Sequence, residues 1–324
     1  MNMLARPAEM VDPMKPVRTQ FADTMLAVGV EDPDLVVMVG DISHFALQPF
    51  ANACPGRFFN IGICEPASVS IAAGLSKAGI VPVFHTIAPF IVERAFEQIK
   101  LDFCYHRLGG NLITVGSAFD YANLGSTHHC YNDFALLKTL QNVELCNPGS
   151  AIEFDALFRQ TYRSASLTYH RLPGHPHGVT FTPDDVVLGR AIRIAEGEDL
   201  TIVASGAQLR SAVEARPKLK RLGWNPEILY IHTIRPLDVA AIQASVRKTG
   251  RVVVVEEHMQ SGGLGDDVLR AIRDIPQVAF ASIAIPDTFV TGYGKYDTHC
   301  RTLGLTADGI VSTVSTQIQP KSRQ

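Results

Sequence analysis

The first half of the chain alternates short apolar runs with longer segments in which apolar residues recur every three or four positions. Buried strands are predicted by the apolar runs at 35–39, 81–84, 111–115 and 143–146. Helices are predicted by the periodic segments at 19–30, 91–103 and 132–140. Because these strands and helices alternate, the pattern favours a parallel sheet with helices on both faces.

The same alternation returns after the polar, proline-containing segment 178–190. It predicts strands at 199–204, 227–231, 251–255 and 278–285, and helices at 207–222 and 237–245. The glycine-rich turn at 261–265 lacks the Lys-Ser/Thr ending of a phosphate loop, so we expect a tight strand-to-helix turn. We predict an α/β fold of two doubly wound domains, each a mostly parallel sheet with helices on both faces. The expected divisions are an N-terminal arm (1–16), a first domain (17–177), a linker (178–190) and a second domain (191–324).

Composition narrows the classes of partner. The 324 residues, 46% hydrophobic and 19% charged, suffice for two domains that each bury a core. A net charge of −3 gives no electrostatic reason to expect nucleic acid or an anionic membrane as a partner. No apolar run reaches the length of a signal-peptide core or a membrane span, so we expect a cytoplasmic protein. The six cysteines show neither a CxxC pair nor Cys/His ligand spacing, and we expect reduced thiols and no metal ligands in this chain.

One acidic residue, Glu65, interrupts the apolar stretch 57–75. A short strand, a bend at Gly62 and a helix are predicted there, which puts the acid at a strand-to-helix junction. Glu65 could cap the helix, with Pro66 in the first turn, because a negative charge near a helix N-terminus is favourable. A carboxyl group among apolar residues could also be an active-site acid. The spacing alone leaves both explanations open.

Three motifs follow one another around this acid. They are GICE at 62–65 with AAGL at 72–75, TIAPF at 86–90 with RAFEQI at 94–99, and GSTH at 125–128. Together they resemble the pyrimidine-binding domain of the transketolase family of thiamine diphosphate enzymes. The resemblance extends over nearly the whole chain, so it implies a pyrimidine-binding domain at 17–177 and a transketolase C-terminal domain at 191–324.

The resemblance implies a role for five residues at the cofactor. Glu65 would touch N1′ of the aminopyrimidine of thiamine diphosphate, which requires a carboxyl group in a dry pocket. Phe90 would stack on the pyrimidine ring. Ile63, Ile87 and Arg94 would line the same place, although Ile87 stands where the family usually has a first phenylalanine.

The substrate would meet a second set of residues. His128 would face the substrate and take part in proton transfer or hydrogen bonding. His129 and His85 are further candidates, and Arg171 resembles the family arginine that grips a substrate phosphate. Leu124 stands where typical members have the aspartate of G-x-D-G-x-T-H. We therefore expect a substrate that differs at the carbon next to the reacting carbonyl, or a relaxed stereochemical preference.

The family's metal motif is missing from the sequence. Members hold the cofactor's diphosphate through Mg²⁺ or Ca²⁺ bound by a G-D-G…N motif, and the sequence contains no G-D-G. The resemblance thus implies the C-terminal subunit of a split transketolase, with the metal and the rest of the shared thiamine diphosphate held by an N-terminal subunit in an α2β2 heterotetramer. Such an enzyme transfers a two-carbon ketol unit from a ketose, first of all a sugar phosphate, to an aldose.

Three alternatives stay open. Two are enzymes: the β subunit of the first component of a 2-oxoacid dehydrogenase, and a carboligase similar to deoxyxylulose phosphate synthase. The third is a non-catalytic relative that acts as a binding subunit, because a shared fold does not by itself imply a shared activity.

Overall fold

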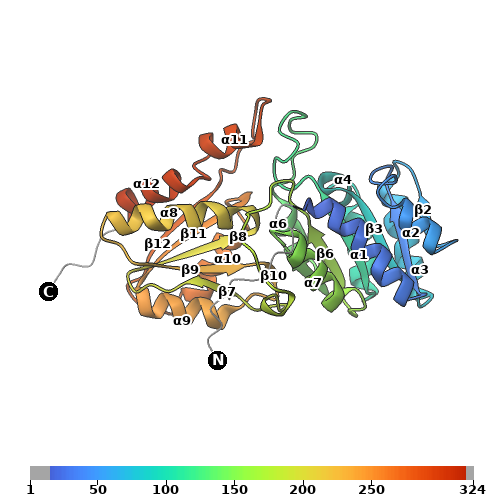
Figure 1. The fold of residues 1–324 in the computed structure, drawn as a ribbon, viewed down its shortest axis with the longest axis horizontal. Coiled ribbons are helices and arrows are strands. Elements are labelled where there is room, and N and C mark those ends of the chain that lie inside the picture. Colours follow the sequence, from blue (N-terminus) through green and yellow to red (C-terminus); the bar gives the residue numbers. More distant parts are fainter. Residues whose placement is uncertain (1–14, 319–324) are drawn as a thin grey trace.

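The structure, a computed structural model, describes residues 15–318. Two sheets lie side by side along the long axis of the molecule, each between layers of helices (Figure 1). This confirms the predicted α/β class with two mostly parallel sheets. Most of the predicted N-terminal arm lies outside the described residues, and the first helix begins at Val17. Within residues 15–318 no helix is long and apolar enough to cross a membrane.

The first sheet has seven strands: β1 (Leu35–Val39), β2 (Phe58–Asn60), β3 (Val81–Ile87), β4 (Gly110–Val115), β5 (Val143–Cys146), β6 (Leu167–Arg171) and β10 (Thr233–Arg235). Their order is β10-β5-β6-β4-β3-β1-β2, and all neighbours are parallel except β10 and β5. Strands β1, β4 and β6 are buried along their whole length. This is expected of continuous apolar runs in a sheet that is covered on both faces.

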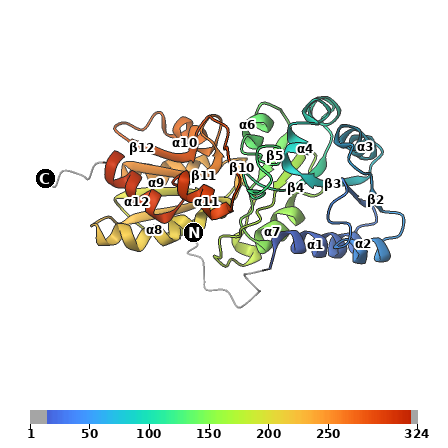
Figure 2. The same cartoon turned by 90° about the horizontal axis from the view of Figure 1, so that it is seen from above.

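Helices cover both faces of this sheet (Figure 2). They are α1 (Val17–Glu31), α2 (Gln48–Ala53), α3 (Glu65–Lys77), α4 (Ala88–Val92), α5 (Phe96–Gln98), the π-helix η1 (Ile99–Tyr105), α6 (Asp133–Lys138) and α7 (Ala151–Thr161). Helices α1, α2 and α7 lie on one face, and α3, α4 and α6 lie on the other. The single helix predicted at 91–103 is instead three short pieces, α4, α5 and η1.

The second sheet has five strands: β7 (Ile192–Ala195), β8 (Leu200–Ser205), β9 (Pro226–Ile231), β11 (Arg251–Met259) and β12 (Ala279–Ile285). The order is β12-β11-β8-β9-β7, and only the edge pair β7 and β9 is antiparallel. The helical segments are η2 (Pro183–Asp185), η3 (Gly206–Gln208), α8 (Leu209–Arg221), α9 (Val239–Thr249), α10 (Leu264–Ile272), α11 (Tyr296–Thr302) and α12 (Ala307–Gln317). Helix α8 packs with α12 on one face, and α9 packs with α10 on the other.

The two halves share one strand. β10 comes from the second half of the sequence but pairs with β5 of the first sheet, with Thr233 opposite Cys146. The Arg235 guanidinium fixes this edge by donating to the carbonyls of Leu140 and Lys138, at 2.8 and 2.7 Å. The segment 178–190 lies between β6 of the first sheet and β7 of the second. Strand β10 follows it in the sequence but belongs to the first sheet.

The glycine-rich turn before α10 binds an internal carboxylate. Glu256 accepts hydrogen bonds from the backbone N–H groups of Leu264 (2.6 Å) and Gly265 (2.7 Å). Burial raises the pKa of Glu256 to about 7. The N–H groups that a phosphate would use are thus already paired, which agrees with a tight turn rather than a phosphate loop.

Candidate active site

The three sequence motifs meet at the end of the first sheet where its parallel strands have their carboxyl ends. The carboxyl ends of the parallel strands β1, β3 and β4 lie side by side there, and open α/β sheets usually bind their ligands at these ends. Glu65 opens α3 after β2, Phe90 lies in α4 directly after β3, and His128 lies in the loop after β4, residues 116–132. Residues far apart in the sequence are therefore brought to one place by parallel pairing.

Glu65 is buried but only partly satisfied. Its residue is 1% exposed, and its Oε2 accepts a hydrogen bond from Nη1 of Arg94 at 2.9 Å. Oε1 is buried and has no partner among the described residues. Since Oε2 is used by Arg94 and Oε1 by nothing, the carboxylate does not cap its own helix. A buried acceptor without a partner is costly and points to a missing hydrogen-bond donor.

Two rings and a guanidinium surround this carboxyl group. The Arg94 guanidinium lies 4.3 Å from the centre of the Phe90 ring, a cation–π contact. The His128 ring meets Phe90 edge-on, with 5.3 Å between ring centres. Nδ1 of His128 lies 2.9 Å from Oγ1 of Thr127. Glu65, Arg94, Phe90 and His128 thus form one contiguous group.

The apolar wall expected beside Glu65 is incomplete within this chain. Ile87, at the end of β3, is half-buried, but Ile63 is 72% exposed. Leu124, on the same loop as His128, is 43% exposed. Ile63 therefore does not shield Glu65 from solvent, and the roles predicted for these three residues stay predictions.

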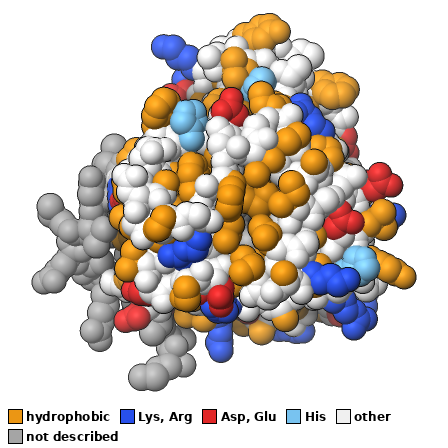
Figure 3. All heavy atoms as spheres, turned by 90° about the vertical axis from the view of Figure 1, so that its right-hand side faces the viewer, with side chains coloured by type: hydrophobic (Ala, Val, Ile, Leu, Met, Phe, Trp, Pro, Cys, Tyr) orange, Lys and Arg blue, Asp and Glu red, His pale blue; other side chains and the backbone are white. Residues whose placement is uncertain are grey.

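The surface around α3 exposes more apolar side chains than Ile63 alone. Phe59, Ile71, Leu101 and Tyr105 are between 44% and 79% exposed. Figure 3 looks at this end of the molecule and shows hydrophobic side chains gathered across the face. An apolar face of this kind usually marks an interaction site. We call Phe59, Ile63, Ile71, Leu101 and Tyr105 the α3 patch.

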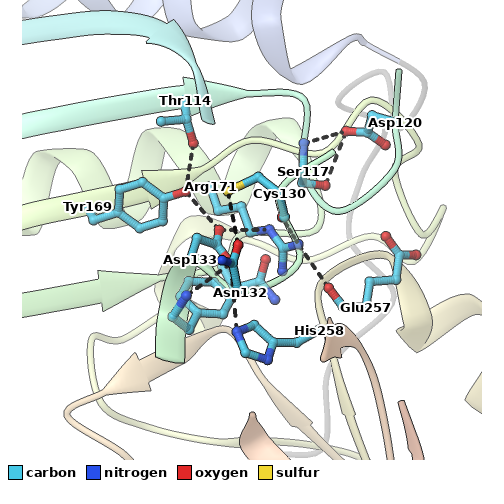
Figure 4. A network of polar contacts seen from close by, with 12 residues as sticks. Thr114, Ser117, Asp120, Cys130, Asn132, Asp133, Tyr169, Arg171, Glu257 and His258 are labelled. Carbon is cyan, nitrogen blue, oxygen red and sulfur yellow. Dashed lines mark hydrogen bonds and ion pairs between the residues drawn. The ribbon is translucent and has the colours of Figure 1, made fainter. Parts of the chain in front are cut away.

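Arg171, which the resemblance assigns to a substrate phosphate, lies in the interior of this chain (Figure 4). Arg171 is 2% exposed, and its Nε lies 3.2 Å from Oδ2 of Asp133. Nη2 donates to the backbone carbonyls of Cys130 (3.2 Å) and Glu257 (2.8 Å). The guanidinium is paired with Asp133 and hydrogen-bonded through Nη2, while Nε, although close to Asp133, has no hydrogen-bond partner among the described residues.

Asp133 is the acceptor at the centre of this network. Tyr169 donates its hydroxyl to Asp133 Oδ2 at 2.8 Å, and Thr114 donates to the Tyr169 oxygen at 3.0 Å (Figure 4). Because Arg171 also holds Cys130, the network fixes the end of loop 116–132 close to His128. The Asp133–Arg171 pair therefore supports the loop, and the substrate-binding role expected of Arg171 stays a prediction.

His85 and His129 also lie in the interior. His85 is fully buried, with Nδ1 donating to the Ile113 carbonyl at 2.9 Å and Nε2 2.8 Å from the Ser43 hydroxyl. Burial lowers its pKa to about 3, so it is neutral at ordinary pH. His129 is 4% exposed and packs edge-on against His299 of α11, with 5.8 Å between ring centres. Both rings are buried in this structure, and the two ring nitrogens of His129 have no partner among the described residues, so the predicted substrate contacts of His85 and His129 stay predictions.

Sequence reasoning missed a group next to the site. Arg18, Asp41 and Ser43 line a cavity of about 520 Å³ at the carboxyl end of β1. Arg18 Nε donates to Ser43 Oγ at 2.7 Å, and Ser43 in turn reaches His85. Asp41 and Ser43 have φ values of 56° and 57°, a strained region for residues other than glycine that is common at functional sites. The one sequence signal was the Gly-Asp pair after a strand, which is also typical of an ordinary turn.

No group of three or more His, Cys, Asp or Glu side chains within residues 15–318 is arranged to hold a metal ion. Two family models match the chain, the transketolase pyrimidine-binding domain over residues 14–173 and the transketolase C-terminal domain over residues 189–310. One of the subunits of the apulose-4-phosphate transketolase of Phocaeicola vulgatus is 32% identical over 307 residues, which cover 94% of this chain and 98% of that protein. The chain belongs to the transketolase family.

Two further comparisons describe its place among transketolase relatives. The 1-deoxy-D-xylulose-5-phosphate synthase of Heliobacterium modesticaldum is 32% identical over 305 residues, which cover 91% of this chain but 46% of the synthase. The chain thus spans about half the length of that relative. A solved split-gene transketolase, described as an inactive β4 tetramer, matches with a TM-score of 0.86 and 30% identity over 94% of this chain and 99% of that one. The resemblance seen in the sequence is confirmed for the family and for the fold.

Proposed function

We propose that this transketolase-family chain is the C-terminal subunit of a split, thiamine diphosphate-dependent transketolase. It would transfer a two-carbon ketol unit from a ketose to an aldose. The observation that carries the proposal is the buried Glu65 carboxyl, which has one unpaired oxygen and is linked through Arg94 to the Phe90 ring, at the carboxyl end of the parallel strands. That arrangement fits the aminopyrimidine end of the cofactor.

Thiamine diphosphate, when bound, supplies a thiazolium carbon that adds to a ketose carbonyl and allows the neighbouring carbon–carbon bond to break. Glu65 would hydrogen-bond through Oε1 to the pyrimidine nitrogen N1′ and hold the ring in its reactive tautomer. Phe90 would support the ring by stacking. His128, beside Phe90, would hold or move a proton at the substrate oxygens.

With Arg171 buried, Arg18 becomes our candidate for an anionic group of the substrate. Its guanidinium lines the cavity at the carboxyl end of β1 and is held by Ser43. A forked guanidinium suits the phosphate of a sugar phosphate substrate. Leu124 stays the residue expected to set the preference at the carbon next to the reacting carbonyl.

A second polypeptide would complete the site. It would carry the G-D-G…N motif and Mg²⁺ or Ca²⁺, hold the diphosphate and cover the α3 patch, in an α2β2 heterotetramer. Two observations support this: the relative from Phocaeicola vulgatus is named as one subunit of a transketolase, and the side chain of Ile63 beside Glu65 is exposed. We also propose that the assembly works in the cytoplasm.

The proposal is tested by reconstitution. The chain is co-expressed with an N-terminal transketolase subunit, supplied with thiamine diphosphate and Mg²⁺, and assayed for ketol transfer between sugar phosphates. Activity that requires both subunits supports the proposal. Full-rate ketol transfer by this chain alone would show that the division into two subunits is wrong. An inactive complex that still assembles would favour a non-catalytic binding subunit.

A second candidate function is supported by the similarity to deoxyxylulose phosphate synthase. Leu124 removes the side chain that would recognise a donor hydroxyl, so it does not distinguish a ketose donor from pyruvate. The reconstituted complex is therefore also assayed with pyruvate and an aldehyde phosphate. Carbon dioxide release with condensation would favour the synthase-like carboligase, and the same release with transfer to a lipoyl group would favour the dehydrogenase β subunit.

A further inference from the structure

The second sheet has a switch point in its topology. β8 connects through α8 to β9 on one side, and the chain then crosses through α9 to β11 on the other side of β8. The connections from β8 and β11 therefore leave in opposite directions. In open α/β sheets a crevice forms at the carboxyl ends of two such strands, and ligands bind there.

A cavity of about 190 Å³ lies next to this end of β8, lined by η3, α8, α11 and the start of α12. Figure 1 shows α11 lying over this end of α8. The side chains that matter for its chemistry are those of His175, Gln208, Arg210, Glu214, Tyr296 and Arg301. None of them belongs to the group around Glu65.

Gln208 presents an unpaired acceptor in this cavity. It is 2% exposed, and its Nε2 donates to Glu257 Oε1 at 2.7 Å. Because a carboxylate oxygen accepts, the amide nitrogen must face Glu257 and the amide oxygen must face away from it. That oxygen, Oε1, is buried and has no partner among the described residues. The inner end of the cavity therefore lacks a hydrogen-bond donor.

The mouth of the cavity, unlike its buried inner end, is exposed and lined by charged side chains. Arg210 and Arg301 are exposed there, next to the acidic side chains of Glu214 and Asp297. His175 stacks on Tyr296 at 3.8 Å between ring centres and forms a flat wall. A fitting ligand is small and donates N–H groups at the inner end, and at the mouth an anionic group would find the two arginines while the two acidic side chains restrict its position.

We propose that this cavity binds a small α-amino acid as its zwitterion. The ammonium group donates to Gln208 Oε1, and the carboxylate faces Arg210 and Arg301, whose Nη2 atoms already donate to the Pro176 carbonyl (2.7 Å) and the Thr298 hydroxyl (3.3 Å) and whose remaining N–H groups serve as charge-assisted donors. The proposal does not depend on the function proposed for the first sheet. The site also adjoins the loop network, because Glu257, which holds Gln208, accepts from Arg171 through its backbone carbonyl.

The test is a calorimetric titration of the purified full-length chain with each of the common amino acids. We expect at least one to bind saturably at a single site. The same ligand without its ammonium group, or without its carboxylate, should bind about tenfold more weakly or worse. Gln208→Leu and Arg210→Ala should each lower the affinity by about tenfold. Lys220→Ala, an exposed change on α8 outside the cavity, should leave it unchanged.

Three outcomes would overturn the proposal. They are no saturable binding of any amino acid at millimolar concentration, binding that neither variant weakens, and equal binding of the simple carboxylate, which would indicate a general anion site. Circular dichroism checks that each variant is folded. If Gln208→Leu does not fold, Arg210→Ala decides, because that side chain lies at the surface.

Discussion

Arg94 occupies, in this structure, the place that the site would give to a cofactor ring. Its Nη1 lies 2.9 Å from Oε2 of Glu65, and its guanidinium covers the Phe90 ring at 4.3 Å. A pyrimidine that stacks on this face of Phe90 and bonds Glu65 would have to displace it. The Arg94 side chain is 46% exposed, so it is free to swing toward solvent.

The first prediction concerns this displacement. In the reconstituted complex, Arg94→Met should bind thiamine diphosphate more tightly, by up to about tenfold, because one cation–π contact and one half-exposed ion pair no longer have to break. Equilibrium dialysis of the cofactor measures the affinity. Lys100→Met, an exposed change on η1, is the matched control. Weaker cofactor binding by Arg94→Met would instead show that Arg94 stays and helps to hold the ring.

The second prediction concerns Glu65 itself. Glu65→Gln keeps the size of the side chain but removes the acid, so kcat should fall about a hundredfold or more. Assembly with the partner subunit, followed by size-exclusion chromatography, should be unchanged. Glu97→Gln, a change to an exposed acid of the same motif region, is the control. Near-normal turnover by Glu65→Gln would remove the basis of the proposed function.

The sequence was sufficient for the strands that are buried on both faces. The mainly apolar runs at 35–39 and 143–146 form β1 and β5 as predicted, buried throughout in β1 and at all positions but Glu144 in β5. Strand β10 could not be predicted, because its three residues pair with β5 from the first half of the chain. The residue pattern of 233–235 gives no sign of this pairing. Only the structure shows that Glu65 makes no capping hydrogen bond, although its charge does lie in the first turn of α3 as the cap explanation requires.

The site residues were predictable where the motif itself fixes the geometry. Phe90 and His128 are neighbours as expected from their motifs. Arg171 was assigned to substrate because a motif shows residue type and order but not burial. In this chain Arg171 pairs with Asp133, which lies far earlier in the sequence, at the start of α6. Arg18 was missed because its position in the cavity depends on where α1 packs, which the sequence pattern does not show.

The third prediction tests the buried pair. Asp133→Asn removes the carboxylate paired with the buried Arg171 guanidinium, which should lower the free energy of unfolding by about 3 kcal/mol. Urea unfolding of the full chain measures this. The control is Asp308→Asn, which breaks an exposed pair with Lys218 and should cost about 1 kcal/mol or less. Equal effects of the two changes would mean that the buried network does not stabilise the fold.

The fourth prediction is a pH dependence from His85. Burial lowers the pKa of His85 from 6.5 to about 3, so between these values the unfolded chain takes up a proton that the folded protein does not. The contribution of the neutral His85 to the free energy of unfolding is therefore fully present above pH 6.5 and is lost as the pH falls toward 3.

Comparison with His85→Asn isolates this contribution. The stability advantage of the wild-type chain over the variant should shrink by up to about 1.4 kcal/mol for each pH unit below 6.5. Urea unfolding of both proteins at a series of pH values measures it. A difference between the two proteins that does not change with pH would contradict the prediction.

The fifth prediction concerns Leu124, whose half-exposed side chain cannot accept a hydrogen bond. It lies on the same loop as His128, and the loop is tied down by the bond from the Leu124 N–H to the Tyr121 carbonyl at 2.8 Å. Leu124→Asp should restore an acceptor for a hydroxyl next to the reacting carbonyl. The kcat/KM for xylulose 5-phosphate, relative to an analogue without that hydroxyl, should rise by about tenfold.

Leu124→Ala is the control for Leu124→Asp. It removes the leucine side chain without adding an acceptor, so it distinguishes the effect of the new hydrogen bond from the effect of the added space. If both variants change the preference equally, the effect comes from space and not from hydrogen bonding. If Leu124→Asp leaves the ratio of kcat/KM values unchanged while the complex stays active, Leu124 does not face the substrate. The preference would then have to come from another part of the assembled site, such as the cavity next to Arg18 or the surface of the partner subunit.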